Sequence, residues 1–183
     1  MKILVTNDDG IAADGLWLLV RELTGIAEVV VVAPDREQSA GGTAVTLWQP
    51  LRIRKARPVV PGVETFAVEG TPSDSVLLAL GSLIKDRIDL VVSGINSGLN
   101  LGDDIYISGT VSAAFQGYLQ GYSALAVSAK SKSEASHQIA AKLAATLAKR
   151  LNASPSSPKL FLCLLYTSPS PRDLSTSRMP SSA

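Results

Sequence analysis

Short apolar runs alternate with segments of helical periodicity along most of this chain. The runs within 2–6, 28–33, 89–93 and 124–129 are continuous, and four valines follow one another at 29–32. A strand without polar alternation is typical of a parallel sheet that helices cover on both faces. Helical patterns fill 14–23, 71–84, 109–120 and 133–151. The sequence therefore predicts an α/β fold with a doubly wound, mostly parallel sheet.

Two stretches depart from this alternation. Polar and apolar residues alternate at 51–54, while Pro50, Pro58 and Pro61 break the chain around them. This pattern predicts a half-exposed β-hairpin within 43–67 that projects from the main sheet and flanks the functional loops. Further along, 152–158 has the composition of a Ser/Pro linker, and 159–165 is predicted to add one more strand.

The last segment, 166–183, is rich in serine, threonine and proline and holds few apolar residues. We expect it to be disordered, because it has no core to build. Its sequence also resembles translated sequencing-adapter DNA, so we interpret it as a non-native tail. The sequence therefore predicts a single domain at residues 1–165, which is incomplete at its C-terminus.

Composition narrows the class of protein. A chain of 183 residues with 46% hydrophobic residues can bury one sizeable core. Lys and Arg number 17 against 16 Asp and Glu, and the net charge of +1 gives no broad field for a nucleic-acid polymer or a membrane surface. The sequence shows one cysteine, no signal-like N-terminus and no apolar stretch near the roughly 20 residues of a membrane span. We expect a cytoplasmic protein.

Candidate chemistry appears first at Asn7-Asp8-Asp9-Gly10, directly after the first apolar run. Two adjacent carboxylates at the end of a buried strand need a cation to be tolerated. Carboxylate ligands favour Mg²⁺, Mn²⁺ or Ca²⁺, and one cysteine with one histidine disfavours a zinc site. The alternative is that one aspartate caps the following helix. The single histidine, His137, lies near a predicted helix start, where we expect it to be exposed surface.

Later loops bring further polar groups to the same edge, because the carboxyl ends of parallel strands meet there. In 34–43, Ser39 offers a hydroxyl oxygen to a metal. In 93–110, the amide of Asn96 can complete a cation's oxygen shell without adding charge. Ser108-Gly109-Thr110 opens a helix whose free N–H groups favour phosphate, with a capped helix after a glycine-rich turn as the alternative. Together these loops predict metal-assisted phosphoryl chemistry, and no Walker sequence points to an ATPase of that kind.

On these residues the chain resembles the survival protein E (SurE) family of metal-dependent nucleotidases. The matching stretches are 3–11, 33–36 with Gln38-Ser39, 70–74, 92–96, 100–104 and 108–111. The resemblance implies a Rossmann-like domain that hydrolyses nucleoside 5′-monophosphates, with tolerance for 3′-monophosphates and short polyphosphate.

The resemblance also implies roles for single residues. Asp8 and Asp9 would be catalytic, with Asp9 the candidate base and a nucleophilic role for one aspartate left open. One divalent ion, Mg²⁺ or Mn²⁺, would be held by Asp8, Asp9, Ser39 and Asn96. The phosphate pocket would be lined by Asn7, Gly94, Asn100, Ser108, Gly109 and Thr110.

The chain departs from the family pattern at a few places. Ala40 stands where a second glycine is expected, Ile107 replaces an aromatic residue, and Gln116 replaces a glutamate. The C-terminal third, which in the family adds a strand-rich extension used in dimer contacts, is missing. The resemblance implies a homodimer or homotetramer for the full-length protein.

Two other functions stay open. A receiver-like phosphoacceptor domain also carries an acidic pair after its first strand, and it would use Ser93 as switch hydroxyl together with Lys130. It needs an aspartate where this chain has Glu69. The other possibility is a folded but inactive fragment of a nucleotidase.

Overall fold

The structure, a computed structural model, describes residues 1–152 and 158–167. Most of the predicted linker and the predicted tail from 168 onward lie outside the described residues. Within them, a seven-stranded sheet has the order β3-β4-β2-β1-β5-β6-β7. The strands are β1 (Lys2–Thr6), β2 (Glu28–Pro34), β3 (Ile53–Lys55), β4 (Glu64–Val68), β5 (Leu90–Ser97), β6 (Ser123–Ala129) and β7 (Phe161–Tyr166).

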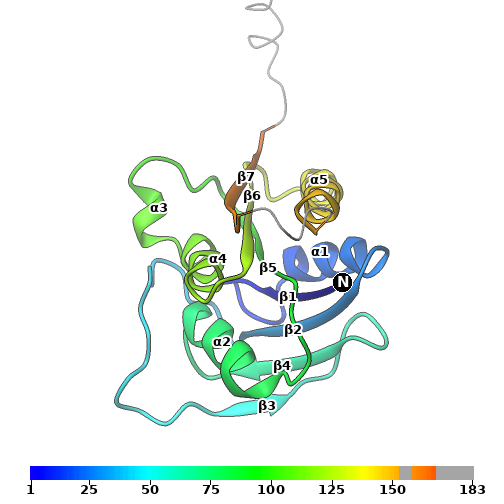
Figure 1. Cartoon of the computed structure of the whole chain (residues 1–183). Helices are drawn as coiled ribbons and strands as arrows, with labels where there is room; N and C mark the ends of the chain where they lie inside the picture. Colours follow the sequence, from blue (N-terminus) through cyan, green and yellow to red (C-terminus); the bar gives the residue numbers. More distant parts are fainter. Residues whose placement is uncertain (153–157, 168–183) are drawn as a thin grey trace, which may run out of the picture.

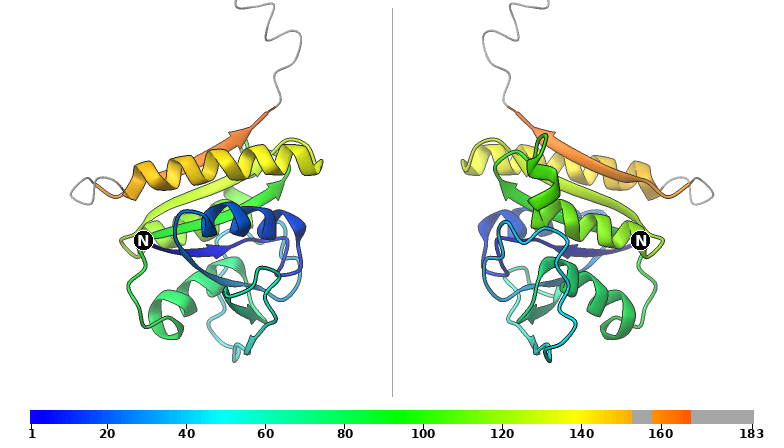
Figure 2. Two further views of the ribbon diagram at one scale, coloured as in Figure 1. Left: turned by 90° about the vertical axis from the view of Figure 1, so that its right-hand side faces the viewer. Right: turned by 90° about the vertical axis from the view of Figure 1, so that its left-hand side faces the viewer.

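Helices cover both faces of this sheet (Figure 1). The helices are α1 (Asp14–Thr24), α2 (Pro72–Leu78), α3 (Asp104–Ile107), α4 (Gly109–Leu119) and α5 (Glu134–Asn152), with a short π-helix η1 (Ala79–Leu83) after α2. α1 packs beside α5 on one face, as Figure 2 shows, and α2 packs beside α4 on the other. Every neighbouring strand pair is parallel except β3 with β4. The predicted doubly wound α/β fold is confirmed.

Alternate residues of β1 enter two separate apolar clusters. Ile3 and Val5 pack in the cluster that includes α1 and α5, and Leu4 packs in the cluster that includes α2 and α4. Burial on both faces explains why the strand sequence shows no polar alternation.

The predicted hairpin is formed by β3 and β4, which pair antiparallel. β4 also pairs parallel with β2, from Val30 opposite Glu64 onward, so the hairpin continues the sheet at its edge, and the prediction that it projects from the sheet is wrong. The long connection between β2 and β3 contains most of residues 34–43, the loop that carries Ser39.

Some local structure differs from the sequence prediction. β5 continues through Ser97, with an irregular register between Ser93 and Asn96, so this stretch is strand rather than loop. The Gly94–Ile95 peptide is cis. The short helix α3 has no counterpart in the prediction, and β7 ends at Tyr166, one residue past the predicted boundary.

The predicted start of α2 is confirmed in detail. The Thr71 hydroxyl accepts a hydrogen bond from the Asp74 N–H at 3.0 Å, and the Asp74 carboxylate accepts one from the Thr71 N–H at 2.9 Å. Pro72 follows as the first helical residue, where its missing N–H costs nothing. This capping box fixes where the helix begins.

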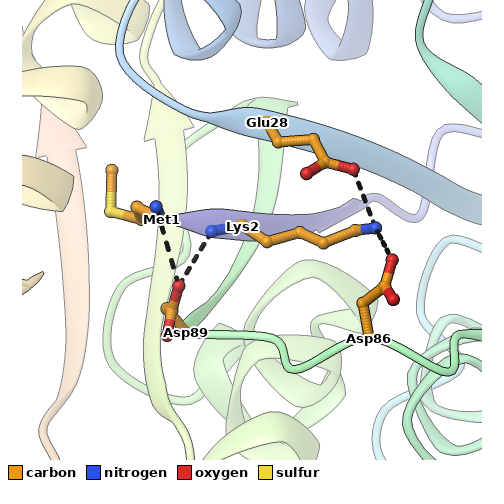
Figure 3. A network of polar contacts seen from close by, with 5 residues as sticks. All are labelled: Met1, Lys2, Glu28, Asp86 and Asp89. Atoms are coloured by element: carbon orange, nitrogen blue, oxygen red, sulfur yellow. Dashed lines mark hydrogen bonds and ion pairs between the residues drawn. The ribbon is translucent and has the colours of Figure 1, made fainter.

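A polar network closes the amino-terminal edge of the central strands (Figure 3). The Lys2 ammonium lies 2.6 Å from the Asp86 carboxylate and 2.8 Å from that of Glu28. These hydrogen bonds raise the pKa of Lys2. The Lys2 N–H also donates to Asp89 at 2.8 Å, and the Met1 amine lies 3.9 Å from the same carboxylate. The network stabilises the amino-terminal edge of the sheet, which is opposite the edge that carries the functional loops.

Among the residues that the structure describes, we find no helix with the length and apolar character needed to cross a membrane.

Candidate metal and phosphate site

The two adjacent aspartates contact different elements. The Asp8 carboxylate accepts a hydrogen bond from the Thr110 hydroxyl and is 4% exposed. Asp9 instead lines a cavity beside α1 and the start of α5. Asp8 thus contacts the start of α4, which packs on one face of the sheet, and Asp9 lies beside α1 and α5, which pack on the other face. Asp8 and Asp9 therefore lie at the carboxyl edge of the sheet, between the helices of its two faces.

The hydrogen bonds and cations near Asp8 and Asp9 do not offset the cost of burying the two negative charges. Burial raises the pKa of Asp8, and the hydrogen bond from Thr110 offsets only part of that effect. Burial, followed by the charges of Asp8 and Glu37, raises the pKa of Asp9 to about 6, although Lys132 opposes the rise. A cation near these oxygens would relieve the cost of keeping them ionised.

Glycine at position 109 allows the close approach of α4 to Asp8. A Cβ there would lie 2.7 Å from the Asp8 Cβ and 3.2 Å from a ring carbon of Pro72. Ser108 caps the helix, since its hydroxyl accepts from the Val111 N–H at 3.1 Å. The capped helix start proposed as an alternative is therefore present, and the same helix start lies against a carboxylate. The Thr110 backbone N–H also forms a hydrogen bond to Asp8, which lowers the pKa of that carboxyl.

The first two loops are joined by their backbones. The Gln38 N–H donates to the Asp8 carbonyl at 2.7 Å. Gly10 has a φ of 92°, and a Cβ there would lie 2.8 Å from the carbonyl carbon of Arg36. Asn7 donates its side-chain N–H to the Gly10 carbonyl at 2.9 Å, while its buried amide oxygen has no partner in the described residues. Asn7 thus shapes the turn and retains a free acceptor.

The other two residues of the predicted metal set have hydrogen-bond partners of their own. Ser39 is exposed, and its hydroxyl donates to Glu37 at 2.7 Å. Asn96 donates its side-chain N–H to the Gly98 carbonyl at 2.8 Å, which leaves the amide oxygen for another partner. Among the described residues, no hydrogen bond joins Ser39 or Asn96 to Asp8 or Asp9.

Two residues of the predicted phosphate pocket also have structural roles. A Cβ at Gly94 would lie 2.5 Å from the Val127 carbonyl, so close packing of β5 on β6 requires glycine there. Asn100 donates to the Ser128 hydroxyl at 2.9 Å, which fixes the third loop to β6. Both contacts stabilise the loop that precedes α4.

The prediction that His137 is exposed surface is wrong. His137 is 6% exposed, because α5 packs against α1 at Gly15, where a Cβ would lie 3.6 Å from the ring. Its Nε2 lies 3.4 Å from the Ser97 hydroxyl. Burial lowers the pKa of His137, and the charge of Asp14 opposes this effect. One signal of this packing is present in the sequence: Gly15 in the first turn of α1, where a Cβ would lie 2.7 Å from the Ile95 carbonyl oxygen.

The receiver-like alternative finds little support in the geometry. Ser93 is fully buried, and Glu69 lies exposed at the end of β4, 3.6 Å from Arg52. A switch hydroxyl has to reach a phosphorylated side chain, and neither residue is placed for that exchange.

Fold and site together define an α/β protein of the Rossmann-like class, in which an acidic pair meets the start of a helix at the carboxyl edge of a parallel sheet. The sequence model of the family described as "Survival protein SurE" matches residues 3–169. The chain belongs to this family.

Known relatives agree with this assignment. A Dehalococcoides mccartyi protein named 5′-nucleotidase SurE is 54% identical over 164 residues, covering 88% of this chain and 62% of that protein. A Vibrio parahaemolyticus protein of the same name is 46% identical and covers 85% of this chain and 58% of its own length. The crystal structure of the SurE protein from Aquifex aeolicus matches with a TM-score of 0.73 at 38% identity, over 84% of this chain and 60% of that one. The chain spans less than two thirds of each relative's length.

Proposed function

We propose that this domain is a metal-dependent phosphomonoesterase that releases phosphate from nucleoside 5′-monophosphates. The observation that carries the proposal is the buried Asp8 carboxylate held by Thr110 at the start of α4. A carboxylate beside a helix start combines a cation ligand with an anion-binding backbone. The relatives named 5′-nucleotidase SurE support the choice of substrate.

The residues present fit a hard divalent cation. Among the described residues, no group of three or more His, Cys, Asp or Glu side chains forms a metal cluster, so two carboxylates need neutral oxygen donors beside them. The unpartnered amide oxygen of Asn7 shows that an acceptor is available at this edge. We propose that Mg²⁺ or Mn²⁺ is held by Asp8, Asp9, Ser39 and Asn96. When bound, the ion neutralises charge on the phosphate and makes a bound water more acidic.

The chain's own groups position the substrate. The free N–H groups of the first turn of α4 and the Ser108 hydroxyl bind the phosphate oxygens. Thr110 also orients the Asp8 carboxylate through its hydrogen bond. The attacking water passes a proton to an Asp9 carboxylate oxygen as its own oxygen bonds to phosphorus. The bond from phosphorus to the 5′-oxygen breaks, and the nucleoside leaves as its alcohol after taking up a proton from solvent.

We propose 3′-monophosphates and short polyphosphate as further substrates, as the resemblance to the SurE family implies. In the full-length protein we propose a homodimer or homotetramer.

Phosphate release across the nucleoside 5′-monophosphates, with and without added Mg²⁺ or Mn²⁺, tests this function. We expect release only with metal, and loss of most of it in Asp9→Asn. Full metal-dependent activity of Asp9→Asn would refute the role given to Asp9.

A folded but inactive fragment is the second candidate. The observation that favours it is the exposure of large apolar side chains, with Trp48 94%, Tyr106 79% and Leu47 72% exposed. Such surfaces promote self-association. Size-exclusion chromatography of this chain beside a full-length relative decides between them, since a monodisperse, active chain would exclude the inactive fragment.

A further inference from the structure

A cavity of about 610 Å³ lies beside Asp9, on the face of the sheet opposite Asp8. Its walls come from the start of α1, the end of β5 and the start of α5, which Figure 2 shows side by side. Val59, from the loop between β3 and β4, reaches one side of it. The volume falls within the about 300–1,000 Å³ that small-molecule sites occupy. Because Asp9 lines it, the cavity is continuous with the candidate metal site.

The cavity has a polar pair in its wall. The Ser97 hydroxyl lies 3.4 Å from His137 Nε2, and both residues line the cavity. Serine can donate and accept, and a neutral imidazole offers one donor and one acceptor. This pair suits a ligand that carries hydroxyl or ring-nitrogen groups.

Charge argues against a second anionic group in this cavity. Carboxylates outnumber cationic side chains along its wall, and the free acceptor oxygens suit hydroxyl donors. The carboxylates are Asp9, Asp14, Glu37 and Glu134, and the cations are Arg21 and Lys132.

We propose that this cavity receives the nucleoside part of the substrate, with Ser97 and His137 as its selectivity-determining residues. The proposal rests on the proposed function, because it places the phosphate at the Asp8 and Asp9 edge. A neutral nucleoside satisfies the polar pair and leaves the surrounding carboxylates free to accept from the ribose hydroxyls. A substrate without a nucleoside gains none of these contacts.

Direct binding tests the proposal without any catalysis. Trp17 lines the cavity and is held by a hydrogen bond from its indole N–H to the Ile11 carbonyl at 2.7 Å. In a Trp48→Phe background, Trp17 is the remaining tryptophan. We expect adenosine and uridine to change its fluorescence saturably in the metal-free 183-residue chain. Ser97→Ala should weaken this binding about 2- to 10-fold, the effect of one lost hydrogen bond.

A control and a second variant complete the test. Lys142 lies on the exposed side of α5, so Lys142→Gln should leave the nucleoside binding curve unchanged. His137→Phe keeps the ring volume and should weaken nucleoside binding as Ser97→Ala does. Absence of a saturable signal in the parent chain, or an affinity in Ser97→Ala and His137→Phe that equals that of the parent chain, would overturn the proposal.

Kinetics separate this proposal from the proposed function. With AMP and phenyl phosphate as paired substrates, Ser97→Ala should raise KM for AMP and so lower the preference for AMP about 2- to 10-fold. An unchanged preference would refute the cavity assignment. If the parent chain releases phosphate from neither substrate while adenosine still binds, the proposed function fails and the cavity assignment survives as a nucleoside site.

Discussion

Replacing Asp9 with asparagine should stabilise the metal-free domain. Burial and neighbouring charges, not hydrogen bonds, raise the pKa of Asp9 from 3.8 to about 6. At full burial this difference corresponds to about 3 kcal/mol, and solvent around the partly exposed side chain reduces it to about 1–2 kcal/mol. Asparagine keeps the shape and removes the charge. For a domain of this size the gain corresponds to a Tm higher by about 3–6 °C.

The sign depends on pH. Because the folded pKa of Asp9 is raised above the unfolded value, the folded state holds its proton more tightly and loses stability as pH rises from 3.8 through about 6. The stabilisation by Asp9→Asn should therefore be complete at pH 7.5 and small at pH 4. Other carboxylates titrate in both proteins, so the difference between the two Tm values isolates this group.

Thermal unfolding of both proteins in a chelating buffer, at the two pH values, measures the effect. Added Mn²⁺ should raise the Tm of the parent chain at pH 7.5 and raise that of Asp9→Asn less, since the asparagine removes a charged ligand. A metal-free Asp9→Asn that is less stable than the parent at pH 7.5, or equally stabilised at both pH values, would refute the reasoning.

Gly109→Ala should destabilise the domain by about 1–3 kcal/mol, because its Cβ would lie 2.7 Å from that of Asp8. Gly81→Ala, with open space around its Cβ, is the matched control and should stabilise by about 0.5–1 kcal/mol in urea unfolding. Ala40 has a φ of 59°, so Ala40→Gly should raise the unfolding free energy by about 0.5–1 kcal/mol, and a lower value would contradict this. Lys2→Met should cost less than about 1 kcal/mol, and the cost should vanish in high salt, because its partners are exposed carboxylates.

The sheet could be predicted from the sequence because buried parallel strands leave continuous apolar runs. The four valines at 29–32 lie in β2, and Thr71 and Pro72 mark the start of α2 as expected. The path of β5 could not be predicted, since Gly94 and Asn96 are typical of loops, and tertiary packing on β6 keeps them in a strand.

For the site, the sequence indicated which residue types take part, but it did not indicate how deeply they are buried or what they contact. Asp8 and Thr110 are far apart in sequence, and only the packing of α4 on the sheet brings them into contact. The burial of His137 depends on the packing of α5 against α1 and β5, a long-range condition that no local pattern records. The cavity beside Asp9 follows from that same packing.

The most direct test of the central claim is Mn²⁺-dependent release of phosphate from AMP by the parent chain and by Asp8→Asn. Asp8 faces the start of α4 in a buried contact, so the substitution weakens both the cation site and the charge that Thr110 orients. The account predicts metal-dependent release by the parent chain and a loss of at least about 100-fold in Asp8→Asn. Release that is independent of metal, or that survives unchanged in Asp8→Asn, would contradict it.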